Sequence, residues 1–533
     1  MADAPQFPHV PNHVSTVHRA VDILPAAARP STLSPPPMSR SFPRNAFSAA
    51  LILFGLILWP ILHADRLYID DMGRASAGYL GWGSDGRPLA NVLMEVVNAG
   101  TPLTDITPVP QLAALLMLAG LAALIGRRFQ LPGSWLPALC VLPLAGSPYY
   151  LENLSYKFDV LTMTAALVLA AIAALDPMRG RLQLPRKMLL LLMALCLYQP
   201  AANVYVLLVI AQIVAGQWRD TAPGILLRQL GSQIGATLLA CLLYAVVLKQ
   251  TVRGGYSNAH SSIDPTAVAA NLAHFWHYVL MTMTTLRGWV LLVLAGVAVP
   301  LALIGALRYA IRTWPHAGVG TRIALGLAVP LLPLALLVAP WGPMLVLADP
   351  VFAPRVMMGF GALMAASALI LATAVPRLRV DHRYAIGLLV VPAAVMVLIA
   401  SVYGNSLEQQ KAYEDNLSGN MVDDVAALRL QNQLDGIALV GEAGHPPIVR
   451  HNMRKHPILA ELLPVHLTQG WGWATEQLRM FGPVPPMRTI PAETIEQLAN
   501  QKPDIARAAY RVYVRDHVAI FMFKRNGEPP PIR

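Results

Sequence analysis

Apolar runs of membrane-spanning length dominate the hydrophobic pattern over residues 46–401. A helix of about 20 apolar residues crosses the ~30 Å hydrocarbon core of a bilayer and satisfies its own backbone hydrogen bonds there. The fifth and sixth runs are short, and "YQP" at residues 198–200 is either the turn between them or a kink in a longer helix. The pattern predicts an all-α polytopic membrane protein with about eleven spanning helices, at 46–64, 107–126, 134–151, 158–175, 187–198, 201–216, 230–249, 287–308, 322–341, 356–375 and 384–401.

The pattern changes in residues 402–533. "MVDDVAALRLQNQL" has helical spacing, "IALVGEA" is typical of a buried strand, and "YRVYVRDHVAIFMF" is typical of two strands around a tight turn. We therefore expect a small C-terminal α/β or α+β domain that rests on the outer membrane face. "GEAG" beside its first strand is too short to indicate a nucleotide site.

The N-terminal residues 1–45 contain nine prolines and little periodic apolarity, which predicts a disordered cytoplasmic tail. Met38, followed by "SRSFPRN", is a second candidate start of the chain. We expect no cleavable signal peptide, because the first apolar run is long enough to remain as a helix.

Composition and charge add an orientation to this membrane protein. The chain is 55% hydrophobic and 13% charged, whereas soluble domains carry about 25% charged residues. With a cytoplasmic N-terminus, 18 Lys and Arg residues lie in inside segments and 8 in outside loops up to residue 401. The positive-inside rule then favours a cytoplasmic N-terminus, and an odd number of spans places the C-terminal domain outside.

The net charge of +11 follows from this topology. Residues 402–533 hold 14 basic and 14 acidic residues, so the whole excess belongs to the membrane part and a nucleic-acid partner need not be invoked. The three cysteines, Cys140, Cys196 and Cys241, fall in apolar runs, which argues against a disulfide framework and a catalytic thiol.

Acidic residues gather in the first outside loop, 65–106, directly after the first span. Asp70 and Asp71 are adjacent, and Arg74 is i+4 to one and i+3 to the other, so one aspartate is held while its neighbour can accept a proton or bind a cation. A solvated loop with a structural ion pair is the alternative reading. Six of the fifteen acids in residues 1–401 belong to this loop: Asp65, Asp70, Asp71, Asp85, Glu95 and Asp105.

The rest of this loop predicts tight turns followed by a helix. Glycines at positions 73, 78, 81, 83 and 86 permit close backbone approach. After them, Leu89, Val92, Leu93, Val96 and Val97 have the spacing of an amphipathic helix that lies along the membrane surface.

A second polar cluster, "SPYYLENLSYKFD" at 147–159, follows the third span on the same predicted side. Its tyrosines suit an interfacial aromatic belt, but Glu152, Lys157 and Asp159 need another explanation. Arg355 lies just before a later span, where an arginine either anchors a lipid headgroup or grips a phosphate.

"HFWH" places His274 and His277 at i and i+3, a spacing that could hold zinc. No third ligand is evident nearby in the sequence. An aromatic interfacial helix is therefore the preferred reading.

The ordered motifs "DDMGR", "GRPL", "ENLSYKFD" and "YQP" resemble the type II family of bacterial O-antigen glucosyltransferases (Gtr), membrane enzymes of the GT-C class. The resemblance covers roughly residues 50–400 and is strongest in 67–160. It implies a bacterial inner-membrane protein with a periplasmic C-terminal domain. It also implies transfer of glucose, on the periplasmic side, from undecaprenyl-phosphate glucose to a lipopolysaccharide O-antigen.

The resemblance also implies roles for particular residues. Asp70 and Asp71 carry the catalytic carboxylate, and we prefer Asp71 because its i+3 arginine and following glycine suit a helix start. The glycine-rich loop "AGYLGWGSDGRPL" and the later motifs then supply residues that bind the substrates: Trp82, Glu152, Asn153, Tyr156, Asp159, Tyr198 and Gln199.

The chemistry of such a transfer is compatible with these residues. A positioned carboxylate that accepts the proton of a sugar hydroxyl contributes ~10²–10⁴-fold in rate, and direct displacement inverts the anomeric carbon. Alternatively, the adjacent carboxylates bind Mg²⁺ or Mn²⁺. No D-x-D motif occurs, which argues against a nucleotide-sugar donor. Four cations are candidates for the leaving phosphate: Arg74, Arg87, Lys157 and Arg355.

Three other functions stay open on the sequence. A lipid-linked sugar transporter or flippase is disfavoured, because the spans are nearly free of charge and no internal repeat is found. A GT-C transferase for another polyprenyl-phosphate sugar or another cell-envelope glycan fits the same features. A catalytically inactive scaffold is the third alternative.

Overall fold

The computed structural model describes residues 44–177, 180–253, 260 and 262–524. Apart from residues 44 and 45, which begin the first helix, the predicted N-terminal tail lies outside the described residues. Met38 lies outside them as well.

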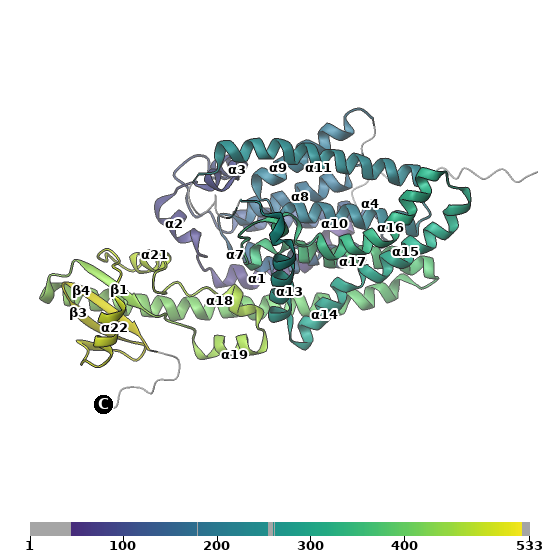
Figure 1. Ribbon diagram of the computed structural model, residues 1–533. Coiled ribbons are helices and arrows are strands. Elements are labelled where there is room, and N and C mark those ends of the chain that lie inside the picture. The colour runs from purple at the N-terminus through teal and green to yellow at the C-terminus, as the bar shows by residue number, and fades with distance from the viewer. Residues whose placement is uncertain (1–43, 178–179, 254–259, 261, 525–533) are drawn as a thin grey trace, which may run out of the picture. The chain divides into compact units, whose positions relative to one another are not determined.

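Helices make up nearly all of the part that was expected to cross the membrane (Figure 1). Short 3₁₀ helices, among them η1 (Trp82–Asp85) and η5 (Pro354–Val356), connect some of them. The α-helices are α1 (Arg44–Ala64), α2 (Asp70–Ala77), α3 (Pro88–Val97), α4 (Val109–Arg128), α5 (Trp135–Val141), α6 (Pro143–Gly146), α7 (Tyr150–Ser155), α8 (Val160–Leu175), α9 (Gln183–Leu197), α10 (Ala201–Trp218), α11 (Pro223–Thr251), α13 (Val268–Met283), α14 (Leu286–Gly296), α15 (Ala298–Thr313), α16 (Val319–Val338), α17 (Met358–Ala374) and α18 (His382–Asn432).

Within the described residues, eight helical segments are long and apolar enough to cross a membrane. They contain α1, α4, α10, α11, α14 with α15, α16, α17 and α18. The predicted spans at 158–175 and 187–198 are helices of 16 and 15 residues, α8 and α9. Residues 198–200 form the turn between α9 and α10, so the kinked-helix alternative is wrong.

The single span predicted at 134–151 is wrong, because this stretch forms the three short helices α5, α6 and α7. Pro143 starts α6, and Pro148 follows the end of that helix. Leu142 keeps helical dihedrals, so α5 and α6 follow one another closely, and the helix ends before Pro148. The polar residues of α7 then lie just before the start of α8.

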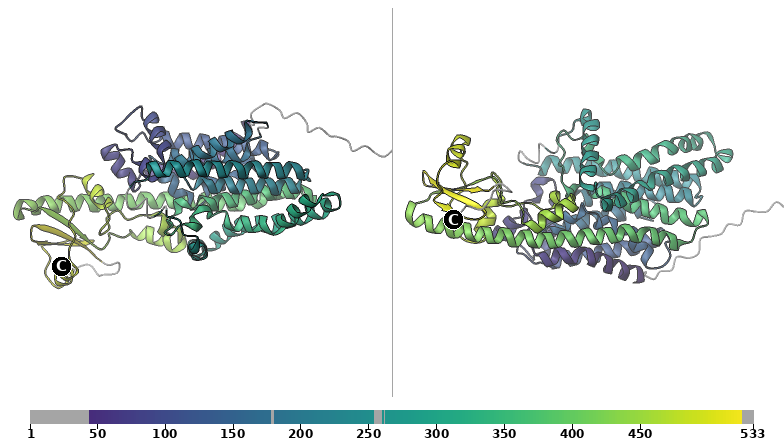
Figure 2. Two further views of the ribbon diagram at one scale, coloured as in Figure 1. Left: turned by 45° about the horizontal axis from the view of Figure 1, so that its top comes forward. Right: turned by 90° about the horizontal axis from the view of Figure 1, so that it is seen from below.

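The helices differ in how far their side chains are buried. Each of the eight helical segments contains an apolar stretch of 18 residues. In the segments of α17 and α10, 94% and 89% of that stretch is buried, whereas in α16 and α11 the fractions are 11% and 22%. Figures 1 and 2 show α10 and α17 among the other long helices, while α13 runs steeply across them. Exposed leucines on α11 and α16 are what a surface in contact with lipid acyl chains requires.

The longest helix, α18, joins the apolar part to the C-terminal domain. It has 51 residues, about 77 Å at 1.5 Å per residue, and therefore exceeds the thickness of a bilayer core. The sequence pattern predicts a span ending at residue 401 and a helix at 421–434. The structure instead has one unbroken helix across the predicted boundary, because no proline lies between residues 393 and 432.

The C-terminal domain has the predicted strands in a mixed four-stranded sheet of order β1-β4-β3-β2. β1 pairs parallel with β4, and the other neighbours are antiparallel. Side chains of α18 pack against one face of the sheet, and Leu498 of α22 packs against the other. The elements are β1 (Gly436–Val440), α19 (Pro447–Lys455), α20 (Ile458–Leu462), α21 (Trp473–Arg479), α22 (Ala492–Ala499), β2 (Ile505–Ala506), β3 (Tyr510–Arg515) and β4 (Val518–Phe523).

Candidate active site

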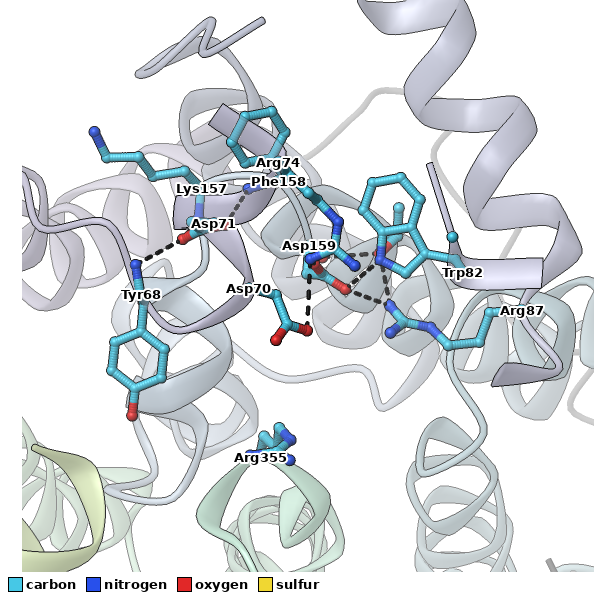
Figure 3. Close-up of polar contacts among 12 residues, drawn as sticks. Tyr68, Asp70, Asp71, Arg74, Trp82, Arg87, Lys157, Phe158, Asp159 and Arg355 are labelled. Atoms are coloured by element: carbon cyan, nitrogen blue, oxygen red, sulfur yellow. Dashed lines mark hydrogen bonds and ion pairs between the residues drawn. The ribbon is translucent and has the colours of Figure 1, made fainter. Parts of the chain in front are cut away.

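Four segments bring the predicted site residues together: α2, the chain from η1 to α3, the connection between α7 and α8, and η5 (Figure 3). All of these segments lie at ends of the long apolar helices. The predicted amphipathic helix is α3, in which Leu89 and Leu93 pack partly against the protein while Val92 and Val96 stay exposed.

Asp71 is fully buried and accepts three backbone hydrogen bonds. Its Oδ2 accepts from the N–H groups of Tyr68 at 3.1 Å and Lys157 at 2.8 Å, and its Oδ1 accepts from Phe158 at 3.2 Å. Burial raises the pKa of Asp71 to about 7, although these three donors oppose the shift. The carboxylate therefore ties the start of α2 to the loop before α8.

Ile69, the residue before α2, has a strained backbone that the hydrogen bonds of Asp71 stabilise. Ile69 has φ of 50°, a conformation that costs energy for a β-branched residue. Asp71 returns a backbone hydrogen bond to the carbonyl of Tyr68 while its side chain accepts the N–H of the same residue. Both bonds hold the sharp turn that presents the first residue of α2.

That first residue is Asp70, whose surroundings differ from those of Asp71. Its side chain is 43% exposed, and its Oδ2 lies 3.6 Å from Nη1 of Arg74. Burial raises the pKa of Asp70, and the charge of Arg74 only partly offsets this. Of the two adjacent aspartates, Asp70 is the one with a carboxylate that a substrate can reach.

Asp159 forms the centre of a buried ion cluster behind Asp70. Its Oδ2 accepts from Arg74 at 3.0 Å, and its Oδ1 accepts from Arg87 at 2.8 Å and from the indole N–H of Trp82 at 2.7 Å. The guanidinium of Arg74 also stacks over the Trp82 ring, 4.2 Å from its centroid. Asp159 thereby holds Arg74 beside Asp70.

Arg355 lies opposite Asp70 in Figure 3 and is held by the residues of "ENLSYKFD" and "YQP". The buried Glu152 accepts its backbone N–H at 2.6 Å and its Nη1 at 2.8 Å. The backbone carbonyl of Arg355 accepts from Asn153 at 3.2 Å and from the Tyr198 hydroxyl at 2.9 Å. The Arg355 side chain remains 29% exposed, so part of the guanidinium can reach a ligand.

Not every predicted residue points into this space. Lys157 turns its ammonium away, to Asp65 at 2.5 Å and Asp105 at 3.0 Å. Gln199 donates to the carbonyl of Asp85 at 2.8 Å. Tyr156 is buried and packs edge-on against the ring of Tyr68.

The residues do not fit a metal held by the paired aspartates. Both oxygens of Asp71 face backbone N–H groups, and Asp70 faces Arg74. Across the described part of the chain, no group of three or more His, Cys, Asp or Glu side chains is arranged to hold a metal ion. His274 of the "HFWH" helix, α13, instead stacks on Phe352.

Sequence reasoning missed the residues that connect this site to the C-terminal domain. Arg66 donates to Glu414 of α18 at 2.5 Å, and the Tyr68 hydroxyl donates to the carbonyl of Leu462 at 3.0 Å. Arg66 and Tyr68 lie just before the two aspartates in the sequence, but their partners lie hundreds of residues away. No signal in the sequence joins them.

Taken together, the long apolar helices and the charged site at their ends indicate a membrane protein. Comparison with protein families refines this class. Residues 59–366 match the family model described as glucosyl transferase GtrII, and the chain belongs to that family. Membership implies a glucosyltransferase that acts in O-antigen modification.

A relative from Salmonella phage P22, described as an uncharacterized 55.3 kDa protein in the gtrB 5'region, is 24% identical over 438 residues. The alignment covers 79% of this chain and 88% of the relative. No solved structure matches significantly.

Proposed function

We propose that the protein transfers glucose from undecaprenyl-phosphate glucose to an O-antigen sugar hydroxyl on the periplasmic face of the inner membrane. The observation that carries the proposal is that two accessible groups face each other across one site. One is the carboxylate of Asp70, and the other is the partly exposed guanidinium of Arg355. A base and a phosphate-binding cation are what this displacement needs.

The proposed reaction is a direct displacement. Asp70 accepts the proton of the acceptor hydroxyl while that oxygen forms a bond to the anomeric carbon of the donor. The bond between the anomeric carbon and the phosphate oxygen breaks, and its electron pair leaves with undecaprenyl phosphate. Attack opposite the leaving group inverts the anomeric configuration.

The proposed roles of the cations follow from their partners. Arg355 is the best placed to bind the leaving phosphate, since Glu152 fixes its orientation without covering it. Arg74 lies beside both Asp70 and Asp159, and we assign it to orienting the base. Arg87 also binds Asp159 and adds positive charge behind the site.

An apolar groove supports a lipid-linked donor. It has a volume of about 590 Å³ and is lined by α10, α11, α15 and α16, with Val209, Ile234 and Leu331 among its residues. On α11 it reaches Leu238, six residues before Tyr244, whose hydroxyl donates to the carbonyl of Gly86 beside Arg87. Six residues correspond to ~9 Å along a helix, so a polyprenyl chain in this groove would end close to the site.

The proposal is tested with purified full-length protein in nanodiscs, synthetic polyprenyl-phosphate glucose and delipidated O-antigen. We expect glucose on the acceptor with inverted configuration, identified by NMR, and no product from UDP-glucose. Turnover should persist in EDTA, since no step uses a metal. A preference for another polyprenyl-phosphate sugar would leave the chemistry intact and contradict the assignment of glucose.

A further inference from the structure

A cavity of about 260 Å³, with both polar and apolar lining residues, lies beside the candidate active site. Three parts of the chain form it: the first loop and the residue after Tyr156, the middle of α18, and the end of α21 with the residues that follow. The C-terminal domain therefore supplies one wall. Its volume is below the ~300–1,000 Å³ of sites for drug-sized ligands and suits one small polar unit.

The charges around this cavity are of both signs. Three cations line it, Arg66, Lys157 and Lys411, together with four carboxylates, those of Asp65, Asp105, Glu414 and Asp415. An anion such as the donor phosphate would meet more carboxylates than cations here. A neutral ligand rich in hydroxyl groups would find acceptors and donors on the same wall.

The remaining lining residues, apart from Gln477, are apolar. Phe481 and Met480 are 40% and 43% exposed, and Leu67 and Ala75 also face the cavity. Sugar rings combine hydroxyl edges with apolar C–H faces, and such faces pack on aromatic side chains. The lining therefore has the two kinds of surface that a pyranose ring requires.

One buried donor in the wall lacks a partner. The side chain of Arg66 is 4% exposed, and its Nη2 donates to Glu414 and to the carbonyl of Pro464. Its Nη1 has no hydrogen-bond partner among the described residues. A buried N–H without a partner costs free energy, so the wall of this cavity contains an unsatisfied donor.

Lys157 connects the cavity to the active site. Its backbone N–H binds Asp71, while its ammonium lies in the cavity between Asp65 and Asp105. Ala75 lines the cavity from α2, five residues or ~7.5 Å along the helix from Asp70. Two neighbouring sugars of one glycan can therefore occupy the cavity and the site of transfer.

We infer that this cavity is an acceptor subsite, which binds a neutral pyranose of the glycan next to the sugar that is glucosylated. The inference deepens the proposed function and rests on it. It also gives the C-terminal domain a role, since Phe481 and Gln477 come from that domain.

The test begins with binding, which does not depend on turnover. Full-length protein in nanodiscs is mixed with delipidated O-antigen or a panel of methyl glycosides, and saturation-transfer NMR reports which sugar protons contact the protein. Phe481→Ala and Lys411→Gln should weaken binding at least fivefold, whereas Phe481→Tyr should retain it. Leu430→Ala and Lys502→Gln, at exposed positions outside the cavity, are the matched controls.

Kinetics then separate the inference from the proposed function. In Phe481→Ala, the KM for the acceptor should rise at least fivefold, while hydrolysis of the donor by water should stay at the wild-type rate. Unchanged binding and KM in both cavity variants would overturn the inference and leave the proposed function standing. Glycan binding that depends on the cavity, without glucose transfer in the wild type, would overturn the proposed function alone. Competition by inorganic phosphate at the cavity would also overturn the inference.

Discussion

At the scale of single residues, Asp70 and Asp71 are neighbours with opposite surroundings. The carboxylate of Asp71 is enclosed by three backbone N–H groups, and that of Asp70 is 43% exposed at the start of α2. The spacing of Arg74 and Gly73 predicts Asp71 as the base. The geometry favours the other assignment, because a base must reach the substrate hydroxyl.

Substitution of each aspartate should separate these roles. Asp70→Asn is expected to lower the transfer rate by ~10²–10⁴-fold, the usual contribution of a positioned base, with little change in Tm. Asp71→Asn is expected to lower Tm, because its amide group would face a buried backbone N–H and leave it unsatisfied at a cost of ~1–3 kcal/mol.

Transfer assays and thermal unfolding measure the two effects. Glu95→Gln, at an exposed position of the same loop, is the matched control and should change neither. Wild-type turnover by Asp70→Asn would contradict the assignment of Asp70.

The stability conferred by Asp71 should depend on pH. Burial raises its pKa to about 7 in the folded protein, above the value of ~3.9 in an unfolded chain. The folded state therefore favours the protonated group, and this stabilisation is complete below about pH 4 and is lost as pH rises through 7. The Tm difference between wild type and Asp71→Asn should narrow over that range. A constant difference from pH 5 to 8 would contradict this prediction.

At the scale of elements, the close crossing of α1 and α18 depends on a glycine. A Cβ at Gly404 would lie 2.4 Å from Cβ of Pro60 and 2.5 Å from its backbone. Gly404→Ala should therefore force the two helices apart and destabilise the protein by ~1–3 kcal/mol. Gly387, in the same helix, has nothing within 4 Å of an added Cβ.

Thermal unfolding of the two variants checks this prediction. Gly387→Ala should be neutral or stabilising by up to ~1 kcal/mol, because alanine favours the helix over glycine. Equal Tm values for the two variants would mean that the crossing tolerates a methyl group. Both sites lie in the apolar part of α18, so the comparison isolates packing.

At the scale of the whole molecule, one buried carboxylate joins the first loop to the C-terminal domain. Glu414 of α18 accepts Arg66 at 2.5 Å and the backbone N–H of His466 at 2.6 Å. Removing it leaves the guanidinium of Arg66 buried without its counter-ion. Loss of one partner of a buried ion pair costs ~3–5 kcal/mol.

Glu414→Ala should therefore lower Tm and speed limited proteolysis between α18 and the C-terminal sheet. Mass spectrometry of the fragments locates the cleavage sites. Asp423→Ala, exposed on the same helix, should leave both unchanged. Identical cleavage of the Glu414 variant and the wild type would show that the domain is held independently of this pair.

How far the sequence predicts this protein depends on the range of the interactions involved. Apolar runs and strand patterns act locally, so they predicted α1, α4, α17 and the hairpin of β3 and β4. The run at 134–151 is not one continuous helix, because the helical stretch that begins at Trp135 ends at Gly146, before Pro148, and α7 begins at Tyr150. α18 was divided at residue 401 because hydropathy falls there while the backbone continues as a helix.

The sequence by itself determined the apolar helices, the charged loop after α1 and the family, because each depends on residues close together in the chain. Only the tertiary structure decided which aspartate is accessible, which cations surround it and that Lys157 faces a second cavity. Burial and ion pairing depend on segments that are distant in sequence, and folding alone brings them together.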